Sequence, residues 1–199
     1  MSTTPMKTRS KFLLSLVAVT LALAAYYLLR DNSLRFKEEV QLASGEIIQV
    51  ARAFKTEAFS ELGGPGGWEA KFNSMVIIKP VRADNPPMWQ SDAGLIPILF
   101  DQDSQTKEWF VVTTFYSCEA WYQLGRPKLP YAEFRLRNGQ WLSVPFSPLH
   151  IGRAANVLTR ISNKKELPLH TLATKRERMS DPRTADEYIK IVDHWSTGC

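Results

Sequence analysis

The chain has 199 residues, of which 44% are hydrophobic and 23% are charged, and this composition excludes an intrinsically disordered chain. Three Lys/Arg and no acidic residue lie in residues 1–29, so the rest of the chain holds 22 basic against 20 acidic residues. The formal net charge of +5 therefore belongs largely to the N-terminus and does not indicate a nucleic-acid-binding surface.

The first predicted element is an uncharged, apolar run at residues 12–29. As an α-helix this run would be about 27 Å long, which is close to the hydrocarbon thickness of a bilayer. Basic residues precede it and no acidic residue occurs before Asp31, so the positive-inside rule keeps the N-terminus in the cytoplasm. The sequence therefore predicts a cytoplasmic basic segment at 1–11, a transmembrane helix at 12–29 and a single-pass protein of the bacterial inner membrane.

A cleaved signal peptide is the alternative, because Ala22-Leu23-Ala24 is similar to a signal-peptidase site. The apolar run continues beyond this site to Leu29, where a cleaved peptide would have a short polar segment, and this favours an uncleaved signal anchor. Both interpretations export the rest of the chain, as a linker at 30–37 followed by a periplasmic β-rich domain at 38–199.

Antiparallel hairpins dominate the exported domain, because β-branched and aromatic residues recur between turn signals. The predicted hairpins pair residues 39–42 with 47–54, 96–100 with 109–115 and 131–136 with 141–144, and a further strand covers 72–78. Gly45 supplies the positive φ of the first turn, and Asn138-Gly139 supplies that of the third.

Loops and short helical segments are predicted to connect the hairpins and follow them. We expect a glycine-rich loop at 63–67, one helical turn at 117–124, an extended or helical run at 154–161 and irregular structure at 162–183. Thr184-Ala185-Asp186-Glu187 is a capping box that predicts a terminal helix, with Tyr188, Ile191, Val192 and Trp195 packed on the sheet. The predicted fold class is α+β, mainly antiparallel hairpins with a C-terminal helix, preceded by the transmembrane helix.

Cys118 and Cys199 are the two cysteines of the chain. In an exported domain such a pair tends to form a disulfide, which would close a loop of about 80 residues and contribute about 2–4 kcal/mol. A free Cys199, or one that pairs between chains, is the alternative.

Cys118 together with His150, His170 or His194 is the candidate for a nucleophile and its base. No motif places a cation near the thiol to activate it, and zinc-binding and hydrolase motifs are absent from the sequence. We therefore predict no catalytic residue, metal ligand or cofactor.

Two polar features are interpreted as solvated surface. Asp101 and Asp103 resemble a calcium-binding loop, but Val112 stands where the bidentate glutamate of an EF-hand is required, which favours a solvated turn. Residues 150–183 hold eight Lys/Arg against three acidic residues, an excess that would suit anionic lipid or an acidic partner. These charges form no helical stripe, which favours a solvated segment.

Aromatic residues on and between the later hairpins form a candidate binding surface. Exposed rings would stack on cell-wall sugars or dock a partner, whereas buried rings would belong to the core, as the strand composition favours. The candidate residues are Trp121, Tyr122, Arg126, Tyr131 and Trp141.

Two runs carry a resemblance to a known family. They are Glu38-Glu39-Val40…Leu42…Gly45…Ile48…Val50…Arg52 and Cys118…Tyr122…Gly125-Arg126-Pro127…Pro130-Tyr131…Phe134…Trp141. Over about residues 36–147 the chain resembles an uncharacterised family of small bacterial envelope-anchored proteins with no established activity. The resemblance implies a recurring exported domain and assigns no functional residue.

The sequence thus predicts a non-enzymatic interaction module, held at the membrane by residues 12–29. Its expected partner is an envelope protein or a cell-wall component, and no nucleic acid is expected. The alternatives are a Cys118-dependent hydrolase and a domain that binds cell-wall glycans through its aromatic residues.

Overall fold

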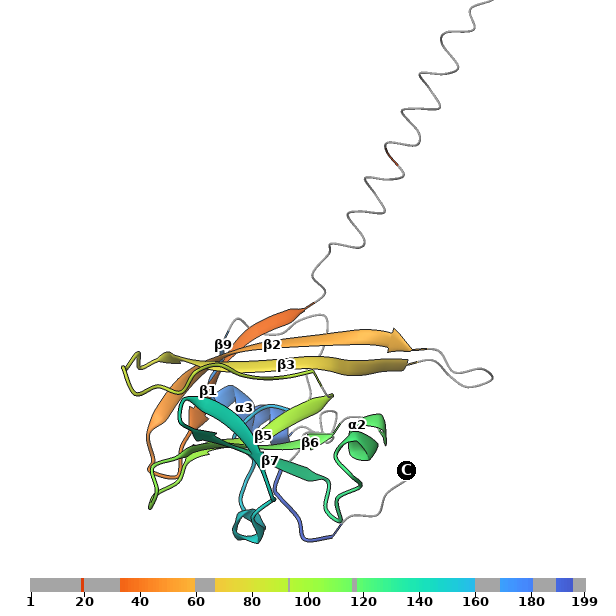
Figure 1. The fold of residues 1–199 in the computed structure, drawn as a ribbon. Helices are drawn as coiled ribbons and strands as arrows, with labels where there is room; N and C mark the ends of the chain where they lie inside the picture. The colour runs from red at the N-terminus through yellow and green to blue at the C-terminus, as the bar shows by residue number, and fades with distance from the viewer. Residues whose placement is uncertain are drawn as a thin grey trace, which may run out of the picture. The chain divides into compact units, whose positions relative to one another are not determined.

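The computed structural model describes Val19 and residues 33–59, 67–92, 94–115, 118–159, 169–180 and 189–194 (Figure 1). The chain divides into two units, residues 1–32 and residues 33–199. Within the described residues, no helix has the length and apolar character needed to cross a membrane. The helix predicted at 12–29 lies outside these residues except for Val19.

The described residues of the second unit contain two β-sheets. Sheet A has the order β4-β3-β2-β1-β9, with β1 at Leu34–Gln41, β2 at Ile47–Phe59, β3 at Gly67–Lys79, β4 at Trp89–Ser91 and β9 at Leu169–His170. Sheet B has the order β5-β6-β7-β8, with strands at Leu95–Gln102, Trp109–Phe115, Tyr131–Arg137 and Gln140–Val144. Every pair is antiparallel except β1 with β9, which is parallel. The predicted class, mainly antiparallel β-structure with few helices, is confirmed.

The three predicted hairpins are present as β1–β2, β5–β6 and β7–β8. Gly45 has φ +88°, and Asn138 and Gly139 have φ +51° and +75°, so the turn residues adopt the left-handed conformation that tight hairpins require. Strand β1 begins at Leu34, inside the predicted linker. The hydrophobic pattern of the sequence does not predict this N-terminal part of β1, because the buried side of the strand includes the charged Glu38 between Phe36 and Val40.

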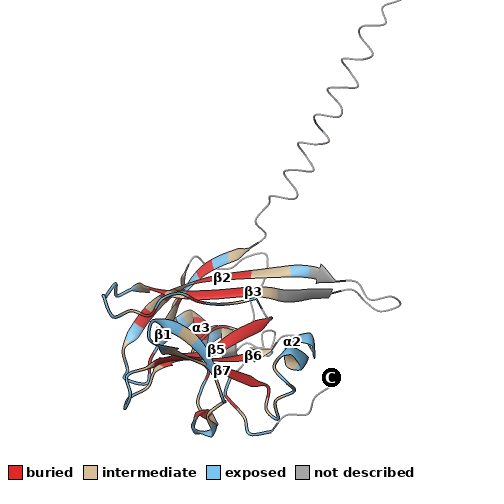
Figure 2. Cartoon of the chain, viewed as in Figure 1, coloured by how far each residue is buried: buried red, intermediate tan, exposed pale blue. Residues whose placement is uncertain are grey.

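Buried residues lie on strands of both sheets (Figure 2), and apolar residues from both sheets belong to the same core cluster. Val40, Val50 and Met75 of sheet A pack in the same cluster as Phe100 and Val111 of sheet B. A second cluster is built from β5, β6 and β7 together with the segment around Ile191. Seven of the eight residues of β5 are buried, and its first six form a continuous apolar run instead of an alternating one.

The helices differ from the prediction near the C-terminus. Helix α2 at Cys118–Gln123 matches the predicted helical turn, but helix α3 at Leu172–Ser180 lies in the segment predicted to be irregular. The predicted terminal helix is wrong over 189–194, where Lys190 forms a β-bridge with Ala154. Ile191 reaches the core through backbone pairing with Arg153 (N···O 3.0 Å), which satisfies its amide without a helix.

Two further predictions concern the connecting segments. Residues 154–159 of the run predicted at 154–161 are neither strand nor helix, and apart from the bridge at Ala154 they follow the edge of β5 without regular secondary structure. There the backbone amides of Asn156 and Val157 both donate to the carbonyl of Ile98. Residues 160–161 of that run lie outside the described residues. The capping box at 184–187 and residues 63–66 of the predicted glycine-rich loop lie outside the described residues, and Gly67, the last residue of that loop, begins β3.

Candidate binding groove

A groove of about 500 Å³ lies where the end of β1, strand β5, the segment 153–156 and helix α3 meet, and we call it the end groove. Leu42, Leu99 and Leu172 are the larger apolar residues of its lining. Its charged lining residues are Asp101, Arg153, Lys175 and Arg176. The groove therefore combines an apolar surface with three cations and one carboxylate.

Lys175 is buried although it lies on a surface helix. Its Nζ donates to Glu38 Oε2 (2.6 Å), to the carbonyl of Glu39 (2.9 Å) and to the carbonyl of Asn156 (2.5 Å). Three acceptors match the three N–H groups of an ammonium, so Lys175 fixes α3 against β1 and the segment 153–156.

Glu38 connects Lys175 to the interior of sheet A. Its Oε1 accepts a hydrogen bond from Arg52 Nη1 (2.6 Å), and its Oε2 also accepts one from the amide of Leu158 (3.0 Å). Phe36 pairs with Arg52 and Glu38 with Val50, so Glu38 and Arg52 are diagonal neighbours on the same face of the β1–β2 ladder. We call Glu38, Arg52 and Lys175 the buried ion cluster.

Arg153 is held at the mouth of the groove by Asp101. Asp101 is buried and accepts from the amides of Ala43 and Gln102, and it forms an ion pair with Arg153 Nη2. The Arg153 guanidinium also lies 5.4 Å from the centre of the Phe110 ring, while its side chain keeps 30% of its surface exposed. The expectation that Asp101 is solvated is wrong, because this carboxylate is an acceptor that joins three segments.

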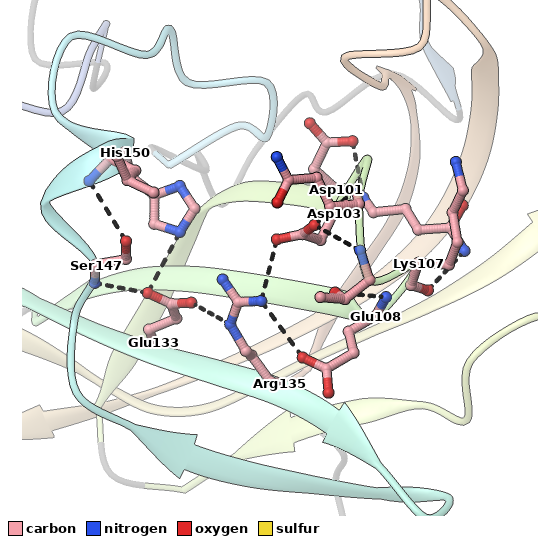
Figure 3. Close-up of polar contacts among 12 residues, drawn as sticks. Asp101, Asp103, Lys107, Glu108, Glu133, Arg135, Ser147 and His150 are labelled. Carbon is pink, nitrogen blue, oxygen red and sulfur yellow. Dashed lines mark hydrogen bonds and ion pairs between the residues drawn. The ribbon is translucent and has the colours of Figure 1, made fainter.

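A second polar cluster lies on strand β7 (Figure 3). Glu133 accepts from Arg135 Nε (2.7 Å) and from the amide of Ser147 (2.8 Å), and its Oε2 lies 3.3 Å from His150 Nε2. Burial alone raises the pKa of Glu133, but contacts with His150, Ser147 and Arg135 outweigh it and lower that pKa. For Arg135, desolvation alone would lower the pKa. The hydrogen bonds and charges of Glu133 and Asp103 outweigh this effect, so the pKa of Arg135 is raised above its ordinary value.

Asp103 is in the solvated turn that the sequence predicts. Its Oδ1 accepts from the amides of Gln105 (2.9 Å) and Thr106 (3.0 Å), and its Oδ2 lies 3.2 Å from Arg135 Nη1. These amides, and then Arg135, lower the pKa of Asp103 from 3.8 to about 2.

Each of the three histidines has its own local environment. His150 is buried and stacks on Phe110 with ring centres 4.7 Å apart. His170 is buried edge-on to Phe36, and His194 is exposed beside Asp193. The two buried rings are therefore packed into the interior of the domain.

Cys118, at the start of α2, is bonded in a disulfide, and the described residues include no free cysteine. Its proposed partner, Cys199, lies outside the described residues, so their pairing stays a prediction. A disulfide sulfur has no thiolate to offer as a nucleophile, which weighs against the Cys118-dependent hydrolase.

The predicted aromatic surface divides into two parts. Trp121, Tyr122 and Arg126 gather at α2, with the Arg126 guanidinium 5.0 Å from the centre of the Tyr122 ring. The Trp121 and Tyr122 rings are inclined at 54°, so they do not form a flat platform for a sugar. Tyr131 is buried, and Trp141 packs against the core while its Nε1 donates to the carbonyl of Pro87 (3.0 Å).

The sequence signal that touches the groove is the excess of basic residues in 150–183, which was predicted to be a solvated segment. Of these residues, Arg153 and Lys175 form ion pairs with buried carboxylates, and Arg176 is exposed. In the described ranges, no group of three or more His, Cys, Asp or Glu residues is placed to hold a metal ion.

Comparisons with known protein families, curated proteins and solved structures gave no match. The resemblance of residues 36–147 to envelope-anchored proteins therefore stays a hypothesis.

Proposed function

We propose that the chain is a membrane-anchored, non-enzymatic binding module of the bacterial envelope. In this proposal residues 12–29 hold it in the inner membrane with the N-terminus in the cytoplasm, and the β-rich domain meets its partner in the periplasm. The end groove is the observation that carries the proposal, because about 500 Å³ lies within the range of ligand-binding clefts.

The bonding of the groove's charged residues supports binding over catalysis. Lys175 donates to three acceptors, and Asp101 accepts from two backbone amides and from Arg153. The hydrogen-bonding groups of Lys175 and Asp101 are therefore used within the fold. Arg153 and Arg176 remain as the cationic groups that an incoming partner contacts, since both retain exposed surface.

The experiment places a photo-cross-linking amino acid at Ala154 of the tagged, full-length chain in living cells. Ala154 is exposed and lines the groove. Leu142 is the control position, because it is also exposed but lies on β8 in sheet B. We expect a discrete cross-linked product from Ala154 that is absent from Leu142.

Membrane attachment is tested in the same cells by washing the membranes with alkaline carbonate. The full-length protein is expected to stay in the membrane fraction. Release by carbonate would contradict the anchor, and identical products from Ala154 and Leu142 would contradict binding through the groove.

A further inference from the structure

We infer that the end groove binds an anionic group, a carboxylate or a phosphate ester, carried on a short apolar body. This inference rests on the proposed binding function and assigns the chemistry that the groove recognises.

The charge of the lining favours an anion. Among the described residues, the lining contributes Arg153, Lys175 and Arg176 against the single carboxylate of Asp101. Glu38 lies behind Lys175, but the same carboxylate also binds Arg52. Lys175 already has three acceptors, so a negatively charged ligand adds a partner for Arg153 and Arg176. A cationic ligand meets repulsion, which is strengthened by the partly buried setting.

The two arginines suit a carboxylate or phosphate by their shape. A guanidinium presents parallel N–H groups that match the two oxygens of such an anion. Arg153 is fixed in advance by Asp101 and by the Phe110 ring, so little side-chain entropy is lost when it binds a ligand. Arg176 follows Lys175 on α3, and the docking of α3 through Lys175 keeps it beside the groove.

The apolar part of the lining accounts for the apolar body. Ala43 and Ala154 are exposed and Leu172 is half-buried, so the groove keeps apolar surface in contact with water. Leu42 and Leu99, which are almost fully buried, form its apolar base. A small inorganic anion contacts the arginines but leaves this surface in water. A ligand with a short hydrocarbon chain covers it and gains the corresponding hydrophobic stabilisation.

Calorimetric titration of the full-length protein in nanodiscs of zwitterionic lipid tests the inference. The probes are hexanoate, hexyl phosphate, the neutral hexanamide and inorganic phosphate. We expect hexanoate and hexyl phosphate to bind about tenfold or more tightly than hexanamide, because a charged hydrogen-bond pair is lost in the amide. The stronger of the two anions identifies whether a carboxylate or a phosphate is recognised.

Variants locate the anion. Arg176→Ala is expected to weaken hexanoate binding about tenfold. Arg153→Lys keeps the charge but removes the fork, and should weaken binding as well. Arg126→Ala at α2 is the control and should leave binding unchanged. A thermal melt of each variant confirms that it is folded.

Equal binding of hexanoate and hexanamide, or unchanged binding in Arg176→Ala, would overturn the anion assignment. Inorganic phosphate binding as tightly as hexyl phosphate would contradict the requirement for an apolar body.

The titration is independent of the cross-linking experiment in cells. Anion binding without a specific cross-link at Ala154 would contradict the envelope partner alone, and a specific cross-link without anion binding would contradict this inference alone.

Discussion

Glu38 is the residue on which the interior of sheet A depends. It is fully buried, and its two oxygens bind Arg52, Lys175 and the amide of Leu158. Burying three charges is costly, and their mutual attraction compensates only while each charge keeps its partner. Removing the Glu38 carboxylate would leave the buried cations of Arg52 and Lys175 without their shared anionic partner.

Glu38→Gln is therefore expected to lower the free energy of unfolding by about 3–5 kcal/mol. Glu57→Gln is the matched control, because Glu57 pairs with Lys55 at the surface and should cost less than about 1 kcal/mol. Urea denaturation of both variants measures the difference. Equal losses would show that the buried ion cluster does not stabilise the fold.

The lowered pKa of Asp103 makes the stability of the folded state depend on pH in the acid range. The pKa of Asp103 in the folded protein is about 2, below the ordinary value of 3.8, so the folded state binds the proton less readily than the unfolded chain. The stabilisation is complete above about pH 4 and is lost as the pH falls through about 2. The lowered pKa of Glu133 acts in the same direction.

We expect Asp103→Asn to reduce the fall in melting temperature between about pH 4 and pH 2. Asp84→Asn, at an exposed turn residue, is the control and should follow the wild-type curve. Melting curves recorded across this pH range make the comparison. A curve for Asp103→Asn parallel to that of the wild type would contradict the role of Asp103.

At the scale of elements, local signals predicted the hairpins and the short helix α2 but failed for the helical structure near the C-terminus. A hairpin turn is decided by adjacent residues such as Asn138-Gly139, which a sequence shows directly. Helix α3 buries the ammonium of Lys175, and a buried lysine does not count as apolar in a hydrophobic pattern. Ile191 fits a helical stripe, but partners distant in the chain hold it in an irregular backbone.

Helix α3 begins with a side-chain cap that can be tested. Thr171 Oγ1 accepts a hydrogen bond from the amide of Thr174 (3.2 Å). Thr171→Ala should cost about 1 kcal/mol, whereas Thr171→Ser, which keeps the hydroxyl, should cost much less. Denaturant unfolding of the two variants measures this, and faster hydrogen exchange in α3 of Thr171→Ala would locate the effect. A loss of equal size in both variants would exclude the cap as its cause.

At the scale of the whole molecule, the candidate site was the part least accessible from sequence. The groove joins residues near positions 41–43, 99–101, 153–156 and 172–176, which only the tertiary fold brings together. Net charge indicated a basic region, but it could not distinguish the exposed Arg176 from Lys175, whose ammonium is buried and bound to Glu38. The hydrophobic patterns of the strands were sufficient to predict the fold class, because each pattern reports the burial of one strand and does not depend on contacts distant in the chain.

The disulfide of Cys118 is predicted to close on Cys199 within one chain. Cys118→Ser should then lower stability by about 2–4 kcal/mol, and Cys199→Ser by the same amount, with no further loss in the double variant. Unfolding curves under non-reducing conditions measure these losses. Alkylation of the wild-type thiols should require prior reduction, and a disulfide-linked dimer on a non-reducing gel would contradict the intrachain bridge.

The distance along the chain between Glu38 and Lys175 has a consequence for the order of folding. Sheet B is a meander of successive strands between residues 95 and 144, so it forms by closing short loops. The contact between Lys175 and Glu38 spans 137 positions. During synthesis from the N-terminus, β1 and β2 emerge long before the lysine that completes their charge pairing. We expect sheet B to form first and sheet A to mature only after α3 is made, so that the first strands of the chain are among the last to be secured.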